Sequence, residues 1–418
     1  MSIFVGVIVG LFMLVFLVTA HEFGHFLMAR RNGVEVEEFG ICFPPRAICW
    51  RKVNGKWKRI PKSQWKKMPG EGLVISLNWL PIGGFCQMKG ESAADTTKGS
   101  FGAANFWKKT KILFGGVAMN WLVAFVILTV LAFTGMPHFI ENQFTIEGDT
   151  KTVAVEPVKI ASVIEGSPAE KAGFKEGDIL KHASYGMMVN CIKAPCPQSG
   201  EVDIEVPDDF TEANAKYPGK KVVITYERDG AENTTEVQLN GSDAEYLFGA
   251  TISGAALYRN TWSAPLVGAG TTLQITGETF KGIGTLLVKF FSGIVKQVNF
   301  NADVRQAGAE ELKTASDSMS GPVGIIGILF PAFTSSGAPY LFFLVAIISI
   351  SLACMNVLPI PALDGGRWLL IAIYKLRKKK LTKETEEKIV SKAFTAIILL
   401  SLIVTAIDII RVVSMGKG

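Results

Sequence analysis

Charged residues are scarce in this chain, and their scarcity excludes the commonest class of protein. They make up 19% of the 418 residues, whereas soluble proteins carry about 25%. Apolar residues make up 49%, and the mean hydropathy is positive, at +0.31. A water-soluble enzyme of ordinary composition is therefore not expected.

Long apolar runs take the place of the missing charge. Four of them approach or exceed the roughly 20 residues that a helix needs to cross a bilayer, which favours membrane spans over buried helices of a soluble core. The first run lacks the basic start and small-residue cleavage site of a signal peptide, so we interpret it as retained. The runs are Ile3–Ala20, Ile112–Thr134, Tyr340–Leu358 and Ala393–Val413.

Lys and Arg residues cluster beside these runs and predict the orientation of the chain. Arg30–Lys67 holds eleven basic residues against three acids, and Lys375–Lys392 holds eight basic residues. The segment Glu141–Asn260 is the reverse, with 20 acids against 11 bases. Basic loops mark the cytoplasmic side, so the middle segment and both termini should face outward, from an inner (plasma) membrane. Because the basic clusters flank membrane spans, no nucleic-acid partner is expected.

The six cysteines divide between these compartments. Cys42, Cys49, Cys86 and Cys354 fall in cytoplasmic or intramembrane parts and are expected to be thiols. Cys191 and Cys196 fall in the outward segment, where an oxidising compartment would favour a disulfide. The sequence leaves this pairing open, because it does not show whether the geometry closes.

The middle segment predicts a separate domain of short strands over residues 155–255. Alternating residues begin at Val158, Val222 and Glu236, and Ser167 with Pro168 should start a short helix that Gly173 ends. The run from Gly166 resembles the signature of PDZ domains, which bind an extended peptide as an added strand. A structural β-module without a ligand is the alternative. The residues from about 189 to 209 have the character of an insertion.

The motif that carries chemistry is His21-Glu-Phe-Gly-His25, which directly follows the first apolar run. Positions i and i+4 of a helix share one face, so His21 and His25 can reach one metal ion. Glu22 can then act as general base on a water, which is the pattern of zinc hydrolases. Ionisable residues next to a membrane span are costly unless they serve a function.

A catalytic zinc ion takes three protein ligands, so a third is expected from another span at similar depth. Asp364 follows the third apolar run, at the cytoplasmic end where His21 and His25 also lie. Pro359, Pro361 and the following glycines break regular helix there, which membranes tolerate where protein surrounds the backbone. The alternative role for Asp364 is a helix cap.

These motifs resemble the site-2 protease family, specifically its bacterial regulator-of-sigma branch, and the resemblance covers nearly the whole chain. It rests on the histidine motif together with Asn356-x-x-Pro-x-x-x-Leu-Asp364-Gly. Pro81–Met88 is similar to the family's membrane-associated β-hairpin, and Gly116-Val-Ala-Met-Asn120 to a motif of its second span. Two features depart from the family pattern: a single PDZ-like domain where well-known relatives have two, and the insertion with Cys191 and Cys196.

The resemblance implies roles for individual residues. Zn²⁺ would be held by His21, His25 and Asp364, and Glu22 would be catalytic. Asn120 and Asn356 would lie near the substrate backbone. The hairpin around Leu77–Met88 would hold the substrate as a strand. Apart from the resemblance, the spacing of apolar residues over Ile283–Val298 suits a helix lying on the outer membrane surface.

The expected fold is therefore a polytopic α-helical membrane protein with four transmembrane helices, a β-hairpin and an extracytoplasmic PDZ-like domain. Its parts are residues 1–136 with the zinc motif, the PDZ-like domain, an interfacial segment over 260–335, and 336–418 with the third ligand. Its partners would be the bilayer and single-span membrane proteins, such as anti-sigma-factor-like regulators or remnant signal peptides, cut after a first cleavage. The oligomeric state stays open. The alternatives are a metal or solute transporter and a catalytically silent peptide-binding scaffold.

Overall fold

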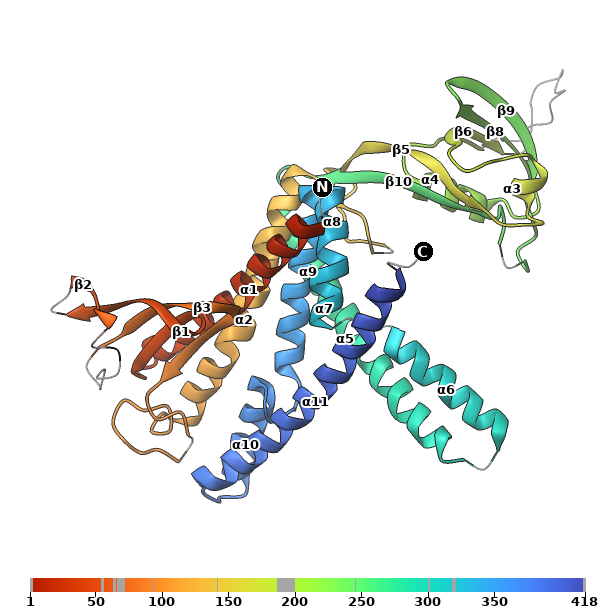
Figure 1. Cartoon of the computed structure of the whole chain (residues 1–418). Coiled ribbons are helices and arrows are strands. Elements are labelled where there is room, and N and C mark those ends of the chain that lie inside the picture. Colours follow the sequence, from red (N-terminus) through yellow and green to blue (C-terminus); the bar gives the residue numbers. More distant parts are fainter. Residues whose placement is uncertain are drawn as a thin grey trace. The chain divides into compact units, whose positions relative to one another are not determined.

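The computed structural model describes residues 3–53, 56–62, 65, 72–92, 94–140, 142–185, 200–244, 246–299, 301–317 and 321–415 (Figure 1). The chain divides into a helical unit, Met1–Leu131 with Pro265–Gly418, and an inserted unit, Ala132–Ala264. The chain thus leaves the helical unit, forms the inserted unit and returns. Cys191 and Cys196 lie outside the described residues, so the proposed disulfide between them stays a prediction.

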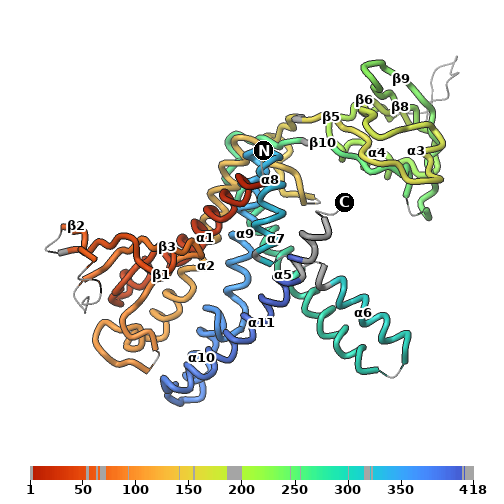
Figure 2. The backbone as a smooth tube through the Cα atoms, viewed as in Figure 1, coloured from red at the N-terminus to blue at the C-terminus, as the bar shows by residue number. Residues whose placement is uncertain are grey.

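Within the described residues, four helices are long and apolar enough to cross a membrane, and each coincides with one of the apolar runs. The prediction of four membrane-competent helices is confirmed. Figure 2 follows them along the chain, two from its first third and two from its last quarter. They are α1 (Ile3–Arg31), α2 (Phe106–Thr134), α9 (Ala338–Val357) and α11 (Lys383–Met415).

Shorter or less uniform helices complete the helical unit. The expected surface helix Ile283–Val298 falls, apart from its last residue, in the second half of α5 (Ala264–Gln297), where the apolar side chains Val288, Phe291 and Val295 are exposed. α6 (Ala302–Asp317) follows it. The remaining elements are α7 (Pro322–Gly324), the π-helical turn η2 (Ile325–Leu329), α8 (Phe330–Ser336) and α10 (Asp364–Leu376).

A small antiparallel sheet follows α1, with strand order β2–β1–β3. Its strands are β1 (Val36–Val53), β2 (Lys56–Arg59) and β3 (Val74–Met88), so the expected hairpin residues Leu77–Met88 fall within β3. β3 pairs with β1 and contacts α1. Phe39 and Cys86 of the sheet share one apolar core with Ile112 of α2 and Leu370 of α10. This core ties the sheet to the helices that carry the histidine motif and Asp364.

α1 and α2 approach each other closely where both lack side chains. A Cβ atom on Gly24 would lie 2.2 Å from the carbonyl oxygen of Gly115, so only glycine fits there. Gly24 stands between His21 and His25 on α1. The contact therefore brings the histidine motif directly against α2.

The inserted unit is built around an antiparallel sheet with strand order β4–β10–β5–β6–β8–β9, and β7 pairs with β6. Its helices are α3 (Pro168–Lys171) and α4 (Pro207–Lys216). Large buried side chains, among them Tyr185 and Phe210, fill its core. The strands are β4 (Met136–Pro137), β5 (Lys151–Val163), β6 (Ile179–Tyr185), β7 (Gly200–Asp203), β8 (Lys221–Arg228), β9 (Ala231–Gln238) and β10 (Ala250–Arg259).

Two details of the inserted unit bear on the predictions. Ser167 caps α3 and accepts a hydrogen bond from the backbone N–H of Glu170, with Pro168 at the first helical position, as predicted. The unit is larger than the expected residues 155–255, because β4 and the outer ends of β5 and β10 extend the same sheet. β4 has only two residues, and the outer ends of β5 and β10 pair with each other far apart in the sequence, so the sequence did not mark them as strands.

Candidate metal centre

The histidine motif lies on the last third of α1, which continues as one helix from the first apolar run to Arg31. His21 and His25 are both buried, with 8% and 7% of their surface exposed. Burial of two polar rings requires partners, because an unpaired polar group in an apolar setting costs free energy. The two rings meet edge to face, with centroids 4.7 Å apart.

Asp364 comes from the opposite end of the chain. α9 ends at Val357, and the chain runs through Pro359 and Pro361 before α10 begins at Asp364. A Cβ atom on Gly366 would lie 2.0 Å from the carbonyl oxygen of Ile360, so glycine allows the tight turn here. The N-cap position of α10 belongs to Leu363, which excludes the capping role considered for Asp364.

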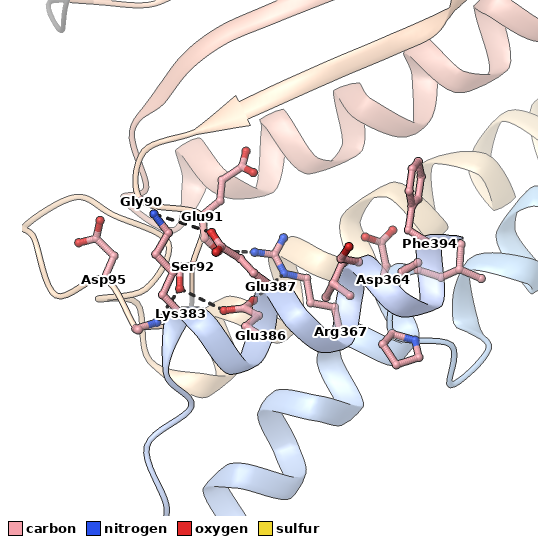
Figure 3. A pocket seen from close by; sticks show the side chains of 16 residues that line it. Gly90, Glu91, Ser92, Asp95, Asp364, Arg367, Lys383, Glu386, Glu387 and Phe394 are labelled. Carbon is pink, nitrogen blue, oxygen red and sulfur yellow. Dashed lines mark hydrogen bonds and ion pairs between the residues drawn. The ribbon is translucent and has the colours of Figure 1, made fainter. Parts of the chain in front are cut away.

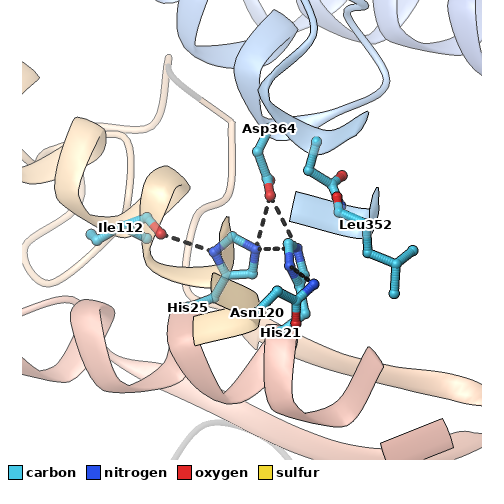
Figure 4. Close-up of polar contacts among 7 residues, drawn as sticks. His21, His25, Ile112, Asn120, Leu352 and Asp364 are labelled. Carbon is cyan, nitrogen blue, oxygen red and sulfur yellow. Dashed lines mark hydrogen bonds and ion pairs between the residues drawn. The ribbon is translucent and has the colours of Figure 1, made fainter. Parts of the chain in front are cut away.

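Three side-chain atoms face one another across these helices (Figure 4). Nε2 of His21 lies 3.1 Å from Nε2 of His25 and 3.1 Å from Oδ2 of Asp364. Nε2 of His25 lies 3.2 Å from the same carboxylate oxygen. Two ligands of one tetrahedral zinc ion, each about 2.0–2.1 Å from the metal, stand about 3.3 Å apart. The donor types and their spacing therefore fit a zinc ion.

His25 is oriented by the main chain of α2. Its Nδ1 lies 2.9 Å from the carbonyl oxygen of Ile112. A carbonyl oxygen only accepts hydrogen bonds, so Nδ1 carries the ring proton and Nε2 presents its lone pair to the centre of the triangle.

Asn120 of α2 lies beside His21, at the ring edge that carries Nδ1. It is fully buried, and its Nδ2 lies 3.4 Å from Nδ1 of His21. Within the described residues, Oδ1 of Asn120 is buried without a hydrogen-bond partner. Turning the amide over directs Oδ1 at His21, where it accepts the Nδ1 proton and leaves Nε2 free to ligate. This orientation of the amide is therefore the one that suits a metal ion at Nε2.

Gly116 of α2 completes the wall of the centre. A Cβ atom there would lie 2.6 Å from Cε1 of His21 and 2.7 Å from Nε2 of both histidines. The absent side chain therefore leaves the space in front of the donor atoms open. The sequence motif Gly116–Asn120 named this position, but its spacing alone does not reveal this role.

Glu22 and Asn356 lie outside the triangle that His21, His25 and Asp364 form. The carboxylate of Glu22 and the donor atoms of the two histidines all lie within 4.8 Å of one another, close enough for Glu22 to face a water molecule there. Asn356 is half-buried and donates from Nδ2 to the carbonyl oxygen of Leu352, 2.9 Å away on its own helix. Among the hydrogen bonds of the described residues, none joins Asn356 to the histidines or to Asp364.

A cavity of about 910 Å³ borders Asp364 (Figure 3). Arg367, Glu386 and Ser92 lie on its wall, and no motif in the sequence marks them as functional. Arg367 and Glu386 stand 19 residues apart, and no pattern in the sequence indicates that they meet. Figure 3 shows that their side chains converge beside the first turn of α10.

Comparison with known proteins identifies the family of the chain. The chain matches the profile described as "Peptidase family M50" over residues 9–401. It is 26% identical to the "Regulator of sigma-W protease RasP" of Bacillus subtilis over 476 aligned positions, covering 98% of this chain and 99% of that protein. It is 30% identical to the "Zinc metalloprotease RasP" of Shouchella clausii over 321 positions, covering 76% and 63%. The expected enzyme class and zinc cofactor are thereby confirmed. The chain belongs to peptidase family M50, the site-2 protease family.

Proposed function

We propose that this metallopeptidase cuts single-span membrane proteins within or beside the bilayer, as a second step after another protease has shortened them. One observation carries the proposal. His21 and His25 lie within α1, a helix long and apolar enough to cross a membrane, and Asp364 follows the end of another such helix, α9, so a substrate bond must come within or beside the bilayer to meet the triangle.

In this proposal His21, His25 and Asp364 hold zinc, and Glu22 takes the proton of the attacking water. A bound zinc ion supplies the acidity that makes water a nucleophile at neutral pH and polarises the scissile carbonyl. Ile112 fixes the tautomer of His25 by presenting its carbonyl oxygen to the Nδ1 proton, and Asn120 would do the same for His21 with its amide turned over. Gly116 leaves room for the peptide bond. The expected contact of Asn356 with the substrate backbone would require its side chain to leave the carbonyl of Leu352.

The substrate would bind beside β3 as an extended strand. Residues 74–77 of β3 pair with β1 on both sides, whereas residues 84–88 have β1 on one side only, which leaves a strand edge for a substrate in the described part of the chain. Trp79, Leu80 and Ile82 on this strand are exposed and would contact apolar substrate residues. Strand pairing also solves a chemical problem, since a peptide bond within a helix is shielded from attack.

The inserted unit would be an extracytoplasmic PDZ-like domain that excludes substrates with large folded ectodomains. β4 pairs with Leu257 and Tyr258 of β10, so within the described residues the stretch from Ala250 to Ala256 has an edge without a neighbouring strand. α4 packs beside β10. A strand edge next to a helix is the arrangement that accepts a peptide by strand addition. The net negative charge of the unit supports its proposed place on the outer side of a plasma membrane.

The proposal is tested by reconstituting the purified protein in vesicles with a single-span substrate whose ectodomain has been trimmed. Mass spectrometry of the products should place the cut within the apolar span or at its border. Removal of zinc by a chelator should stop cleavage, and added zinc should restore it. Cuts confined to the soluble flanks of the substrate would contradict an intramembrane site, even if they depend on zinc.

A further inference from the structure

The position of Asp364 depends on how α10 is anchored. Within the described residues, the hydrogen bonds of the Asp364 carboxylate go to the two histidines and to no structural group behind it. Metal-binding carboxylates are usually held by such a group. The orientation of Asp364 must therefore come from the backbone of the first turn of α10.

Arg367, one helical turn beyond Asp364, makes the contacts that anchor this turn (Figure 3). Its Nε donates to Oε1 of Glu386 on α11 at 3.2 Å, and its Nη2 donates to the carbonyl oxygen of Glu91. Its guanidinium carbon lies 5.0 Å from the ring centre of Phe101. A single side chain thus joins α10 to α11 and to the loop that follows β3.

The acceptor side of this anchor is itself fixed. Only 6% of the Glu386 side chain is exposed, and its second oxygen accepts from the hydroxyl of Ser92 at 3.2 Å. Phe101 is fully buried in the core that also contains Ile112. A guanidinium fork meets two acceptors and a ring face together, which a lysine ammonium does not do.

We propose that Arg367 is a positioning residue for the metal centre, which holds Asp364 at the distance that zinc requires. The proposal rests on the assignment of Asp364 as a zinc ligand. Arg367 acts through the backbone of α10 and touches neither the metal nor the substrate. Loosening it lets the first turn of α10 move away from α1, and the third ligand is lost first.

The experiment measures the rate at which purified, zinc-loaded full-length protein releases zinc to a colorimetric chelator. We expect Arg367→Met to speed release about tenfold, the lower end of the range for residues that support metal ligands. Arg367→Lys should give an intermediate rate, because a lysine retains one of the two polar contacts. Ser92→Ala, a milder change, should speed release slightly. The cobalt-substituted protein should show an altered ligand-field spectrum in Arg367→Met.

A matched control lies on the same cavity wall. Lys383 and Glu387 form an exposed ion pair at 3.8 Å on the first turns of α11, so Lys383→Met removes a cation of α11 without touching Arg367. It should release zinc at the native rate. Native release rates and cobalt spectra in both Arg367 variants would overturn the proposal. If Arg367→Met does not fold, the rates of zinc release from Arg367→Lys and Ser92→Ala test the proposal instead.

The Asp364→Asn variant distinguishes a failure of this proposal from a failure of the assignment of Asp364 as a zinc ligand, on which it rests. If Asp364→Asn retains zinc as the native protein does, the ligand assignment fails and the role of Arg367 falls with it. If Asp364→Asn loses zinc while the Arg367 variants behave as native, only the positioning role fails.

Discussion

At the scale of single residues, the space in front of the histidines matters as much as their donor atoms. Gly116 leaves that space, because a methyl group there would stand 2.6–2.7 Å from ring atoms of His21 and His25. The helical backbone of α2 is anchored on both sides of this position by Ile112 and Asn120. The rings would have to move instead, and with them the ligand geometry.

We therefore expect Gly116→Ala to weaken zinc binding by about 10–100-fold, as other changes that displace metal ligands do. Zinc content after dialysis against a series of buffered free-zinc concentrations measures the effect. Gly277→Ala is the control, since nothing lies within 4 Å of a Cβ at that position of α5. Equal zinc affinity in both variants would show that the histidines adapt to the added methyl group.

Glu22 separates chemistry from metal binding. Replacement by Gln keeps the shape of the side chain but removes the base, so we expect cleavage to fall by about 10²–10⁴-fold with zinc content unchanged. Turnover of a trimmed substrate and metal analysis of the same sample are the measurements. Loss of zinc together with activity would instead make Glu22 a ligand.

The sequence predicts the donor types at this site but not their support. The spacing of His21 and His25 requires only a helix, and the membrane depth of Asp364 follows from the apolar runs. The Ile112 carbonyl, the space at Gly116 and the Arg367–Glu386 pair depend on how helices distant in sequence pack together. A single sequence holds no local pattern for such contacts. Asn120 shows the same limit, since the sequence does not indicate its contact with His21, and its expected role near the substrate stays a prediction.

At the scale of helices and strands, the inserted unit has a buried ion pair that links its stability to pH. Asp178 is almost fully buried and meets Arg228 of β8 through two contacts of 2.6 Å. Burial by itself would raise the pKa of Asp178, but the hydrogen bonds from Arg228 and from the backbone N–H of Lys175 outweigh it and hold the pKa below its ordinary value. The folded state thus binds a proton less readily than the unfolded chain.

A carboxyl group with a lowered folded pKa stabilises the fold above its unfolded pKa, about 3.9 for Asp, and loses this effect as the pH falls through the folded value. We expect Asp178→Asn to cost about 2 kcal/mol at pH 7, below the 3–5 kcal/mol for fully buried pairs because Arg228 is partly exposed. The cost should vanish under strong acid. Hydrogen exchange of β6 and β8 in the full-length protein reports it. As a control, Glu236→Gln removes an exposed ion pair with Lys221 and should change the stability of the unit little. A cost of Asp178→Asn that does not vary with pH would contradict the link between this ion pair and pH.

The elements themselves were largely predictable, and their ends were not. Apolar length identifies the four membrane-competent helices, and the cap at Ser167 follows from local chemistry. The continuation of α1 through the histidine motif follows from the helical spacing of His21 and His25, but its end at Arg31 was not predicted. The outer parts of β5 and β10 are strands only because they pair with each other, a long-range condition that alternation does not reveal.

At the scale of the whole molecule, the charge distribution predicts which parts of the chain share a compartment. Ser242 of the inserted unit and Thr382 before α11 are both exposed, so a reagent can reach either once it is on the correct side. In a background without native cysteines, a membrane-impermeant thiol reagent on intact cells should label Ser242→Cys and not Thr382→Cys. Labelling of Thr382→Cys alone would invert the proposed topology.

The proposed exclusion of substrates with large ectodomains, a size filter, is tested by removing most of the inserted unit. Pro137 pairs with Leu257, so a short Gly-Ser linker between them can replace residues 138–256 and close a hairpin. We expect this variant to cut an untrimmed substrate, which the native protein leaves intact, while the trimmed substrate is cut by both. The same deletion with Glu22→Gln controls for other proteases. An untrimmed substrate that stays uncut beside a trimmed one that is cut would locate the filter elsewhere.

The pairing of β4 with β10 also bears on how such a protein can change over evolutionary time. The strands through which the chain enters and leaves the inserted unit are neighbours, with Met136 opposite Tyr258. Domains whose ends meet can be gained or lost by insertion, because the host chain spans the same gap in either case. A duplication or loss within residues 138–256 would therefore leave α2 and α5 joined as before. Lineages can then gain or lose such an inserted unit by recombination while they inherit the same helical unit.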